Sequence, residues 1–152
     1  MLDWENLEQY REDQRLEAKK AQGGLPESIW ESYSAFANAI GGVILLGVIE
    51  EEADKSFSSV PLCDADQLAA DFWNTLTTPG KVSANILEPD DVQVVESEGN
   101  RIVAIHVPAA EPHQKPVYIG GDPRFGTYVR RGEGDYRCTF AEVAAMQEAA
   151  KI

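Results

Sequence analysis

The sequence predicts an α+β fold: a single domain over residues 1–152, with a mixed β-sheet and about four helices. Three observations indicate this class. Apolar residues recur at helical spacing in segments that are separated by Gly and Pro. A continuous apolar run over 43–49 is typical of a buried strand, and shorter strand-like segments follow in the second half. Helices and strands come in mixed order, as in α+β proteins, and the length suits one domain.

The first half is expected to form two helices and two strands. Residues 3–14 and 26–40 carry apolar side chains at helical spacing, and Pro26 suits the first position of the second helix. Gly41 suits the left-handed residue that closes this helix, while Gly42 permits close packing. The other expected elements are a short strand at 15–19, a strand covered on both faces at 43–49 and a polar turn at 51–59.

The second half is expected to add two helices and four short strands. Asp64 with Gln67, and Thr139 with Glu142, have the spacing of capping boxes that begin helices. The first of these helices ends near Thr78-Pro79-Gly80, and the second runs to about residue 150. The expected strands are 92–95 and 102–107, joined as a hairpin at Glu98-Gly99-Asn100, and then 116–119 and 127–131.

The charge of the chain is strongly negative and unevenly distributed. A formal net charge of −13 argues against a general nucleic-acid binder, which usually carries a basic excess. Residues 50–98 hold 12 acidic and 2 basic residues, a local net charge of −10. Residues 113–138 hold 5 basic and 3 acidic residues, a local net charge of +2. The arginine-rich segment therefore predicts a local anion-binding face, with an ordinary solvated surface as the alternative.

Several classes of site are absent from the sequence. It contains no GxxxxGK[ST] motif, and the glycines near residues 41–47 form no dinucleotide-binding fingerprint. Cys63 and Cys138 fit no metal spacing and are expected to be free thiols, and His106 is expected to be a hydrogen-bonded sheet residue. No apolar run is long enough to span a membrane, and the acidic N-terminus is not a secretory signal. We therefore expect a cytoplasmic protein with no cofactor and no membrane partner.

Four motifs resemble the Schlafen AlbA_2 domain family. They are Leu16-Glu17-Ala18-Lys19, Ser34-Ala35-Phe36-Ala37-Asn38 followed by Gly41-Gly42 and the apolar run to Val48, Pro116-Val117-Tyr118, and Tyr128-Val129-Arg130-Arg131-Gly132. They occur in the family's order, and the resemblance covers about residues 4–150. It implies an AlbA_2-like α+β fold and a DNA-binding role in regulation, often that of a transcriptional regulator. The helicase-like or winged-helix region that often follows this domain in bacteria is missing from the sequence, which implies a stand-alone domain or part of a longer protein.

The last of these motifs suggests where nucleic acid would bind. Arg130 and Arg131 are adjacent in a predicted strand, so their side chains should point to opposite faces. Tyr128 shares a face with Arg130, and an aromatic ring beside a guanidinium can hold a base or a phosphate, or form a structural stack. We expect a phosphate-contacting patch for DNA or RNA that consists of Lys19, Arg130, Arg131 and Arg137, with Tyr128 beside them.

The resemblance also implies an enzymatic alternative. Some Schlafen proteins are ribonucleases that use three carboxylates and a metal, and Glu17 and Glu50 match two of the family's acidic positions. Glu12 is the third candidate, by spacing alone. Clustered carboxylates hold Mg²⁺ or Mn²⁺, which activates water. However, Ile49-Glu50 replaces the family's Asp-Asp, and Glu17 would also form an ordinary surface pair with Lys19, so no catalytic or metal-binding residue is assigned.

A third interpretation is a protein-interaction or small-ligand module that does not bind nucleic acid. The acidic segment 50–54 and the strands near Gly120-Gly121 would then offer an edge to a protein partner, a missing C-terminal domain or a second copy in a homodimer. In this interpretation the net charge keeps the domain soluble. A contiguous positive groove would favour nucleic acid, and a uniformly negative surface would favour protein partners.

Overall fold

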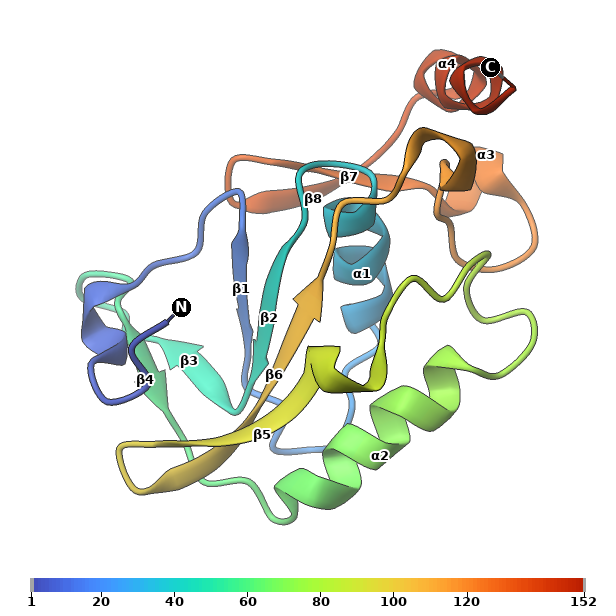
Figure 1. Ribbon diagram of the computed structural model, residues 1–152. Helices are drawn as coiled ribbons and strands as arrows, with labels where there is room; N and C mark the ends of the chain where they lie inside the picture. Colours follow the sequence, from blue (N-terminus) through green and yellow to red (C-terminus); the bar gives the residue numbers. More distant parts are fainter. Residues whose placement is uncertain (1, 152) are drawn as a thin grey trace.

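The computed structural model describes residues 2–151 and shows an α+β domain built on one four-stranded sheet (Figure 1). The strands are β1 (Leu16–Lys19), β2 (Gly42–Leu46), β5 (Val92–Ser97) and β6 (Asn100–Val107). Their order is β1-β2-β6-β5, with β1 and β2 parallel and the other two pairs antiparallel. The mixed sheet and the helices around it confirm the expected fold class.

Two layers of apolar side chains cover the two faces of this sheet. On one face, α1 (Ile29–Ala37) and α2 (Ala65–Leu76) pack against the strands and form the larger part of the core. On the other face, the N-terminal segment packs together with β3 (Val48–Glu50) and β4 (Phe57–Ser59). Because side chains pack on both sides of β2, its sequence is continuously apolar.

The last part of the chain forms a smaller unit that packs on α1. It contains α3 (Pro123–Gly126), a two-stranded ribbon of β7 (Tyr128–Arg131) and β8 (Gly134–Arg137), and α4 (Phe140–Ala150). Helix α1 contacts both strands of the ribbon, and α4 lies at the edge of the molecule beyond it (Figure 1). The ribbon therefore has one face on α1 and an outer face that is only partly covered.

The N-terminal segment is not the helix expected over residues 3–14. Only Leu7–Gln9 form a single turn of 3-10 helix. The Asp3 carboxylate accepts hydrogen bonds from groups two and three residues later, which compete with helical backbone bonds. The Tyr10 carbonyl then accepts from the Phe57 amide, so the segment is held against β4. Tertiary contacts override the helical spacing of its apolar residues.

The apolar run over 43–49 is divided in two, contrary to the single strand expected. Gly47 has φ +91°, and the chain turns there from β2 into β3. A Cβ at Gly47 would lie 3.0 Å from the Leu62 side chain, so glycine suits both the turn and the packing. Strand β3 pairs with β4, which lies in the segment 51–59 that was expected to be a polar turn. This strand forms because the fully buried Phe57 anchors it.

Most other expected elements form, although some of their ends are shifted. Gly41 has φ +80° and its amide bonds the Phe36 carbonyl, which confirms the expected left-handed glycine after the helix, but α1 spans Ile29–Ala37 and not the whole of 26–40. The hairpin within 92–107 and the helices that follow Asp64 and Thr139 are confirmed. The expected strand at 116–119 forms only isolated bridges, and β8 was not expected.

The cysteines and the sheet histidine behave as the sequence suggests. Cys63 and Cys138 are free thiols, and burial raises the pKa of Cys138 to about 11. His106 lies on β6, and its Nδ1 is 3.3 Å from the Asp91 carboxylate, which confirms the hydrogen-bonded sheet position. None of the helices described over residues 2–151 is long and apolar enough to cross a membrane.

Candidate nucleic-acid interface

The β7–β8 ribbon places its side chains in two different environments. Because cross-strand partners share a face, the register sorts the side chains into two sets. The inner set, which faces α1, is Tyr128, Arg130, Asp135 and Arg137, and the outer set is Val129, Arg131, Gly134 and Tyr136. The two adjacent arginines therefore point in opposite directions, as expected: 1% of the Arg130 side chain and 52% of the Arg131 side chain are exposed.

Arg130 is a buried structural residue. Its guanidinium bonds the carboxylates of Glu17 at 2.7 Å and Asp135 at 2.8 Å. Its remaining N–H groups donate to two backbone carbonyls of the segment that leads into β1. Burial opposes the positive charge, but the two carboxylates outweigh it, so the pKa of Arg130 is raised. All five donors are used within the protein, so none is free for a phosphate.

Lys19 belongs to the same ionic network. Its Nζ donates to the hydroxyl of the serine that precedes α1 at 3.0 Å and lies 3.7 Å from the Glu17 carboxylate. The two cations are balanced by two carboxylates, Glu17 and Asp135. This placement revises the expected phosphate-contacting patch. Lys19 and Arg130 face inward to neutralise these carboxylates, and they share no surface with Arg131.

Tyr128 and Arg137 come together at the other end of the ribbon. They are direct cross-strand partners, so their side chains are neighbours on the inner face. The Tyr128 amide bonds the Ser34 hydroxyl and its carbonyl accepts from Asn38, so α1 braces this end of β7. Arg137 is exposed. Two arginines of the expected patch thus remain at the surface, Arg131 and Arg137, on opposite faces of the ribbon.

The outer face of the ribbon combines Arg131 with an aromatic ring that was not singled out from the sequence. Tyr136 is 53% exposed, and a Cβ at Gly134 would lie 2.9 Å from its ring, so the ring lies over this glycine. Arg131 is the diagonal neighbour of Tyr136 on the same face. Its guanidinium pairs with Glu142 in the first turn of α4. The Thr139 amide and the Arg131 guanidinium hold the pKa of Glu142 below its usual range.

A second arginine–aromatic group lies where α4 begins. Phe125 and Phe140 pack edge to face with ring centres 5.5 Å apart, yet they are 50% and 57% exposed. The Arg124 guanidinium lies 5.6 Å from the Phe125 ring centre and pairs with the carboxylate that caps α3. Phe140 and Glu142, the partner of Arg131, both lie in the first turn of α4, two residues apart, so this turn connects the two groups although their side chains leave the helix on different sides. We name the combined region the arginine–aromatic surface: Arg124, Phe125, Arg131, Tyr136 and Phe140.

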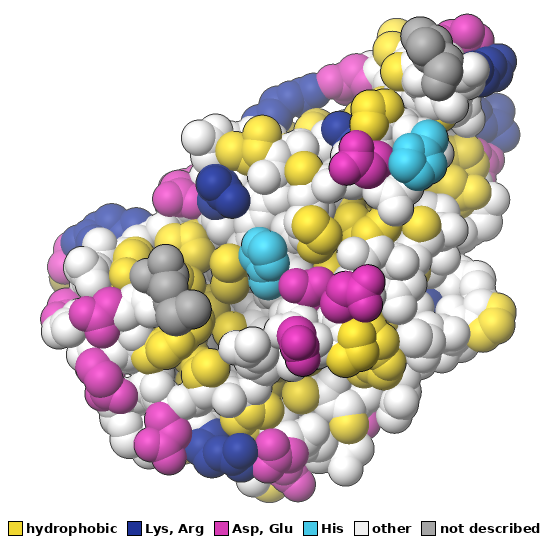
Figure 2. Space-filling model, in the orientation of Figure 1, with side chains coloured by type: hydrophobic (Ala, Val, Ile, Leu, Met, Phe, Trp, Pro, Cys, Tyr) yellow, Lys and Arg dark blue, Asp and Glu magenta, His cyan; other side chains and the backbone are white. Residues whose placement is uncertain are grey.

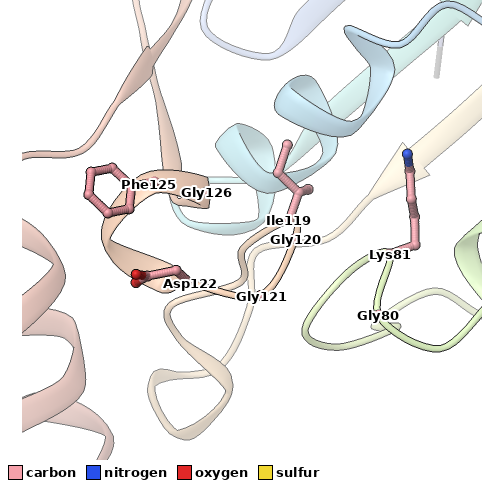
Figure 3. A pocket seen from close by; sticks show the side chains of 8 residues that line it. All are labelled: Gly80, Lys81, Ile119, Gly120, Gly121, Asp122, Phe125 and Gly126. Carbon is pink, nitrogen blue, oxygen red and sulfur yellow. The ribbon is translucent and has the colours of Figure 1, made fainter.

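A cavity of about 450 Å³ borders this surface. It lies between the Gly80-Lys81 turn, residues 119–122 and α3. Figure 3 shows Phe125 on one side of the cavity and Lys81 on the opposite side. The Lys81 ammonium is 3.3 Å from the Glu27 carboxylate, so its charge is already paired. The arginine–aromatic surface thus meets a cavity at Phe125.

Acidic and basic side chains are unevenly spread over the face shown in Figure 2. Acidic side chains lie over its lower and central parts, where few basic ones interrupt them. Lys and Arg side chains gather toward the end that holds the ribbon and α4, with acidic side chains between them. This face therefore carries neither a contiguous positive groove nor a uniformly negative surface, and its positive charge is local.

The three carboxylates of the enzymatic alternative lie near one another but do not fit a metal centre. Burial, a hydrogen bond with Glu17 and the negative charges of Glu17 and Glu50 raise the pKa of Glu12 to about 8. Arg130 and Lys19 engage both oxygens of Glu17. Over residues 2–151, no group of three or more Asp, Glu, His or Cys side chains is arranged to hold a metal ion. Of the three, Glu17 belongs to the ionic network, and we derive no metal-dependent step from these carboxylates.

The structure thus defines an α+β domain with a mixed four-stranded sheet, an inward-facing ionic network and an exposed arginine–aromatic surface. The profile of the Schlafen AlbA_2 family matches residues 12–139, so the chain belongs to this family, as the motifs predicted. The chain is similar to the N-terminal domain of an ATP-dependent DNA helicase RecG-related protein from Nitrosomonas europaea, solved in solution. The two share 29% sequence identity and a TM-score of 0.65 over 92% of this chain and 95% of that chain.

A second solved structure shares the fold alone. It is the crystal structure of the DIP2311 protein from Corynebacterium diphtheriae, with 21% identity and a TM-score of 0.57. The similarity covers 90% of this chain but 24% of that one, so the common domain is about a quarter of the longer protein. No curated protein matches the chain.

The aromatic part of the surface was missed from the sequence, although a signal was present. Between residues 124 and 140, Phe125, Tyr136 and Phe140 are interleaved with arginines. Such interleaving of basic and aromatic residues is typical of single-strand-binding surfaces. The signal was not used because β8 was not expected, so nothing indicated that Tyr136 lies beside Arg131.

Proposed function

We propose that this domain binds nucleic acid through the arginine–aromatic surface and acts as a regulatory binding module. The observation that carries the proposal is the gathering of exposed arginines and exposed aromatic rings at one end of a strongly acidic molecule. Guanidinium groups bind phosphate oxygens, and aromatic rings stack on bases. Membership of the Schlafen AlbA_2 family supports the proposal, as does the similarity to a domain of a protein whose name relates it to the DNA helicase RecG.

The charge of the protein makes the expected binding weak and salt-dependent. A net charge of −13 repels phosphates that lie within the Debye length, about 10 Å at 0.1 M salt. Arg124 and Arg131 must each exchange a carboxylate partner for a phosphate, which lowers the binding free energy that each phosphate contact contributes. Two or three phosphate contacts predict a slope of log affinity against log salt concentration between about −1 and −3.

Titration at several salt concentrations tests the proposal. Labelled DNA and RNA strands of about 20 nucleotides are followed by fluorescence anisotropy, a length that covers one or more sites of this size. The double variant Arg124→Ala/Arg131→Ala should lose about tenfold or more in affinity and show a flatter salt slope.

Arg101→Ala is the matched control. Arg101 is 53% exposed and pairs with the exposed Asp66, as Arg131 pairs with Glu142, but it lies at the start of β6, far from α4 in Figure 1. Its replacement should leave affinity unchanged. Failure of every strand to bind at low salt, or an equal loss in the control and the double variant, would reject the proposal.

A further inference from the structure

We infer that the arginine–aromatic surface selects unpaired bases, so that its ligand class is single-stranded nucleic acid; this inference rests on the proposed function. Among residues 2–151, the large apolar side chains that are exposed by half or more are Ile40, Phe125, Tyr136 and Phe140. All the aromatic members of this set belong to the arginine–aromatic surface. Exposed apolar side chains that cluster in this way mark a binding surface.

Tyr136 offers the first stacking platform. The tip of its ring lies over Gly134, and the missing Cβ at that glycine lets the ring rest against the backbone of β8. Arg131 is the diagonal neighbour on the same face, within reach of the phosphate attached to a stacked nucleotide. One nucleotide of a single strand presents this combination of base face and adjacent phosphate.

The pair of Phe125 and Phe140 repeats the same combination. Their edge-to-face contact fixes the two rings, and half of each residue remains open to solvent. The Arg124 guanidinium lies beside the Phe125 ring, and Arg131 is the diagonal neighbour of Tyr136. The surface thus holds two arginine–aromatic groups on either side of the first turn of α4. A single strand that crosses this turn would place phosphates and bases on both groups.

A duplex cannot use the aromatic half of this surface. In a duplex the base faces are stacked on one another, and only the base edges are accessible in the grooves. The five residues of the surface include no Asn or Gln, the side chains that read adenine edges in the major groove, and their arginines would read guanine edges. A duplex of thymine and adenine alone would therefore keep only the arginine–phosphate contacts and lose the contribution of stacking.

Three probes of equal length separate these contributions. They are an unstructured oligothymidine strand, the duplex that it forms with oligoadenine, and a strand in which most bases are replaced by abasic sites. The abasic strand keeps the phosphates and lacks the bases, so its affinity measures the arginine contacts alone. The oligothymidine should bind about tenfold or more tightly than the abasic strand and the duplex, because each stacked base is worth about fivefold or more and the surface offers two stacking groups.

The variant Tyr136→Ala should weaken oligothymidine binding between about fivefold and a hundredfold, while Tyr136→Phe keeps the ring and the affinity. The affinity of Tyr136→Ala for the abasic strand should not change. Unfolding midpoints of both variants check that the fold is intact. Equal binding of single strand and duplex, or unchanged oligothymidine binding in Tyr136→Ala, would overturn this inference while leaving the proposed function standing. If no probe binds and Arg124→Ala/Arg131→Ala has no effect, both fail together.

Discussion

Replacing Arg130 by methionine should destabilise the domain strongly, whereas the same change at Arg131 should cost little. The Arg130 side chain is almost wholly buried, and it neutralises Glu17 and Asp135, which are 14% and 13% exposed. Methionine fills a similar length with a flexible apolar chain but supplies no hydrogen-bond donor. After the change, the two carboxylates would remain in a poorly hydrated site without their main partner.

The size of the loss follows from this geometry. Removing one partner of a buried ion pair costs about 3–5 kcal/mol, because the remaining charge stays buried without compensation. Lys19 still lies 3.7 Å from Glu17, and the Ser32 hydroxyl still donates to Asp135 at 2.6 Å, so part of the network survives. We therefore expect a loss of about 3–4 kcal/mol out of the roughly 5–15 kcal/mol that is typical of a domain. The Arg131→Met change breaks an exposed pair and should cost about 1 kcal/mol or less.

Urea unfolding followed by tryptophan fluorescence measures both variants. The free energy of unfolding falls by about 1–3 kcal/mol per molar urea. The urea midpoint should therefore fall by about 1 M or more for Arg130→Met and by about a few tenths of 1 M for Arg131→Met. Arg131→Met should instead weaken nucleic-acid binding. Equal midpoints for the two variants would refute the reasoning, because they would mean that the ionic network around Arg130 adds nothing to stability.

Three further predictions follow from other contacts. Glu142→Gln keeps a side chain that completes the capping box but removes the negative charge that pairs with Arg131. The affinity for single strands should therefore rise about two- to fivefold. Glu148→Gln on the same helix is the control and should change this affinity little. Glu12 has its pKa raised to about 8, mainly by burial, so the folded state holds a proton that the unfolded chain has lost, and stability should decline as pH rises from about 4.5 to about 8. Glu12→Gln should remove this decline and raise the free energy of unfolding at pH 8 by about 1–2 kcal/mol, after allowance for solvent screening. Urea midpoints of both proteins at pH 5 and pH 8 measure the effect, and equal pH dependence would contradict it. Gly47→Ala should lose about 1–3 kcal/mol in the same assay, since the left-handed turn and the nearby Leu62 both disfavour a Cβ; an unchanged midpoint would show that β2 can continue without this turn.

Sequence patterns predicted structure well where a segment determines its own conformation. The left-handed Gly41, the caps at Asp64 and Thr139 and the hairpin at 98–100 depend on groups only a few residues apart. Two expected elements that failed depend on distant partners. The segment 3–14 is held by β4, and β4 exists because Phe57 is buried against the far side of the sheet. Local periodicity carries no information about such contacts.

The candidate site shows the same limit. Alternation in β7 predicted correctly that Arg130 and Arg131 point apart, but it did not indicate which of them faces inward. That choice is made by Glu17, which is 113 residues away in the sequence. The prediction therefore placed the buried arginine in the binding patch. It also omitted Tyr136, because the ribbon that brings Tyr136 beside Arg131 is completed by a strand that was not expected.

The motifs that identify the family and the residues proposed to bind nucleic acid are largely different residues. Glu17 and Lys19 of the first motif and Arg130 of the last one meet in the ionic network, which explains why motifs so far apart in the sequence occur together. Arg131 lies in the last motif but outside this network, since its side chain is on the opposite face of the ribbon from Arg130. The aromatic residues of the surface lie outside the four motifs. Membership of the family thus accounts for the fold, and nucleic-acid binding has to be tested at residues that lie mostly outside the motifs.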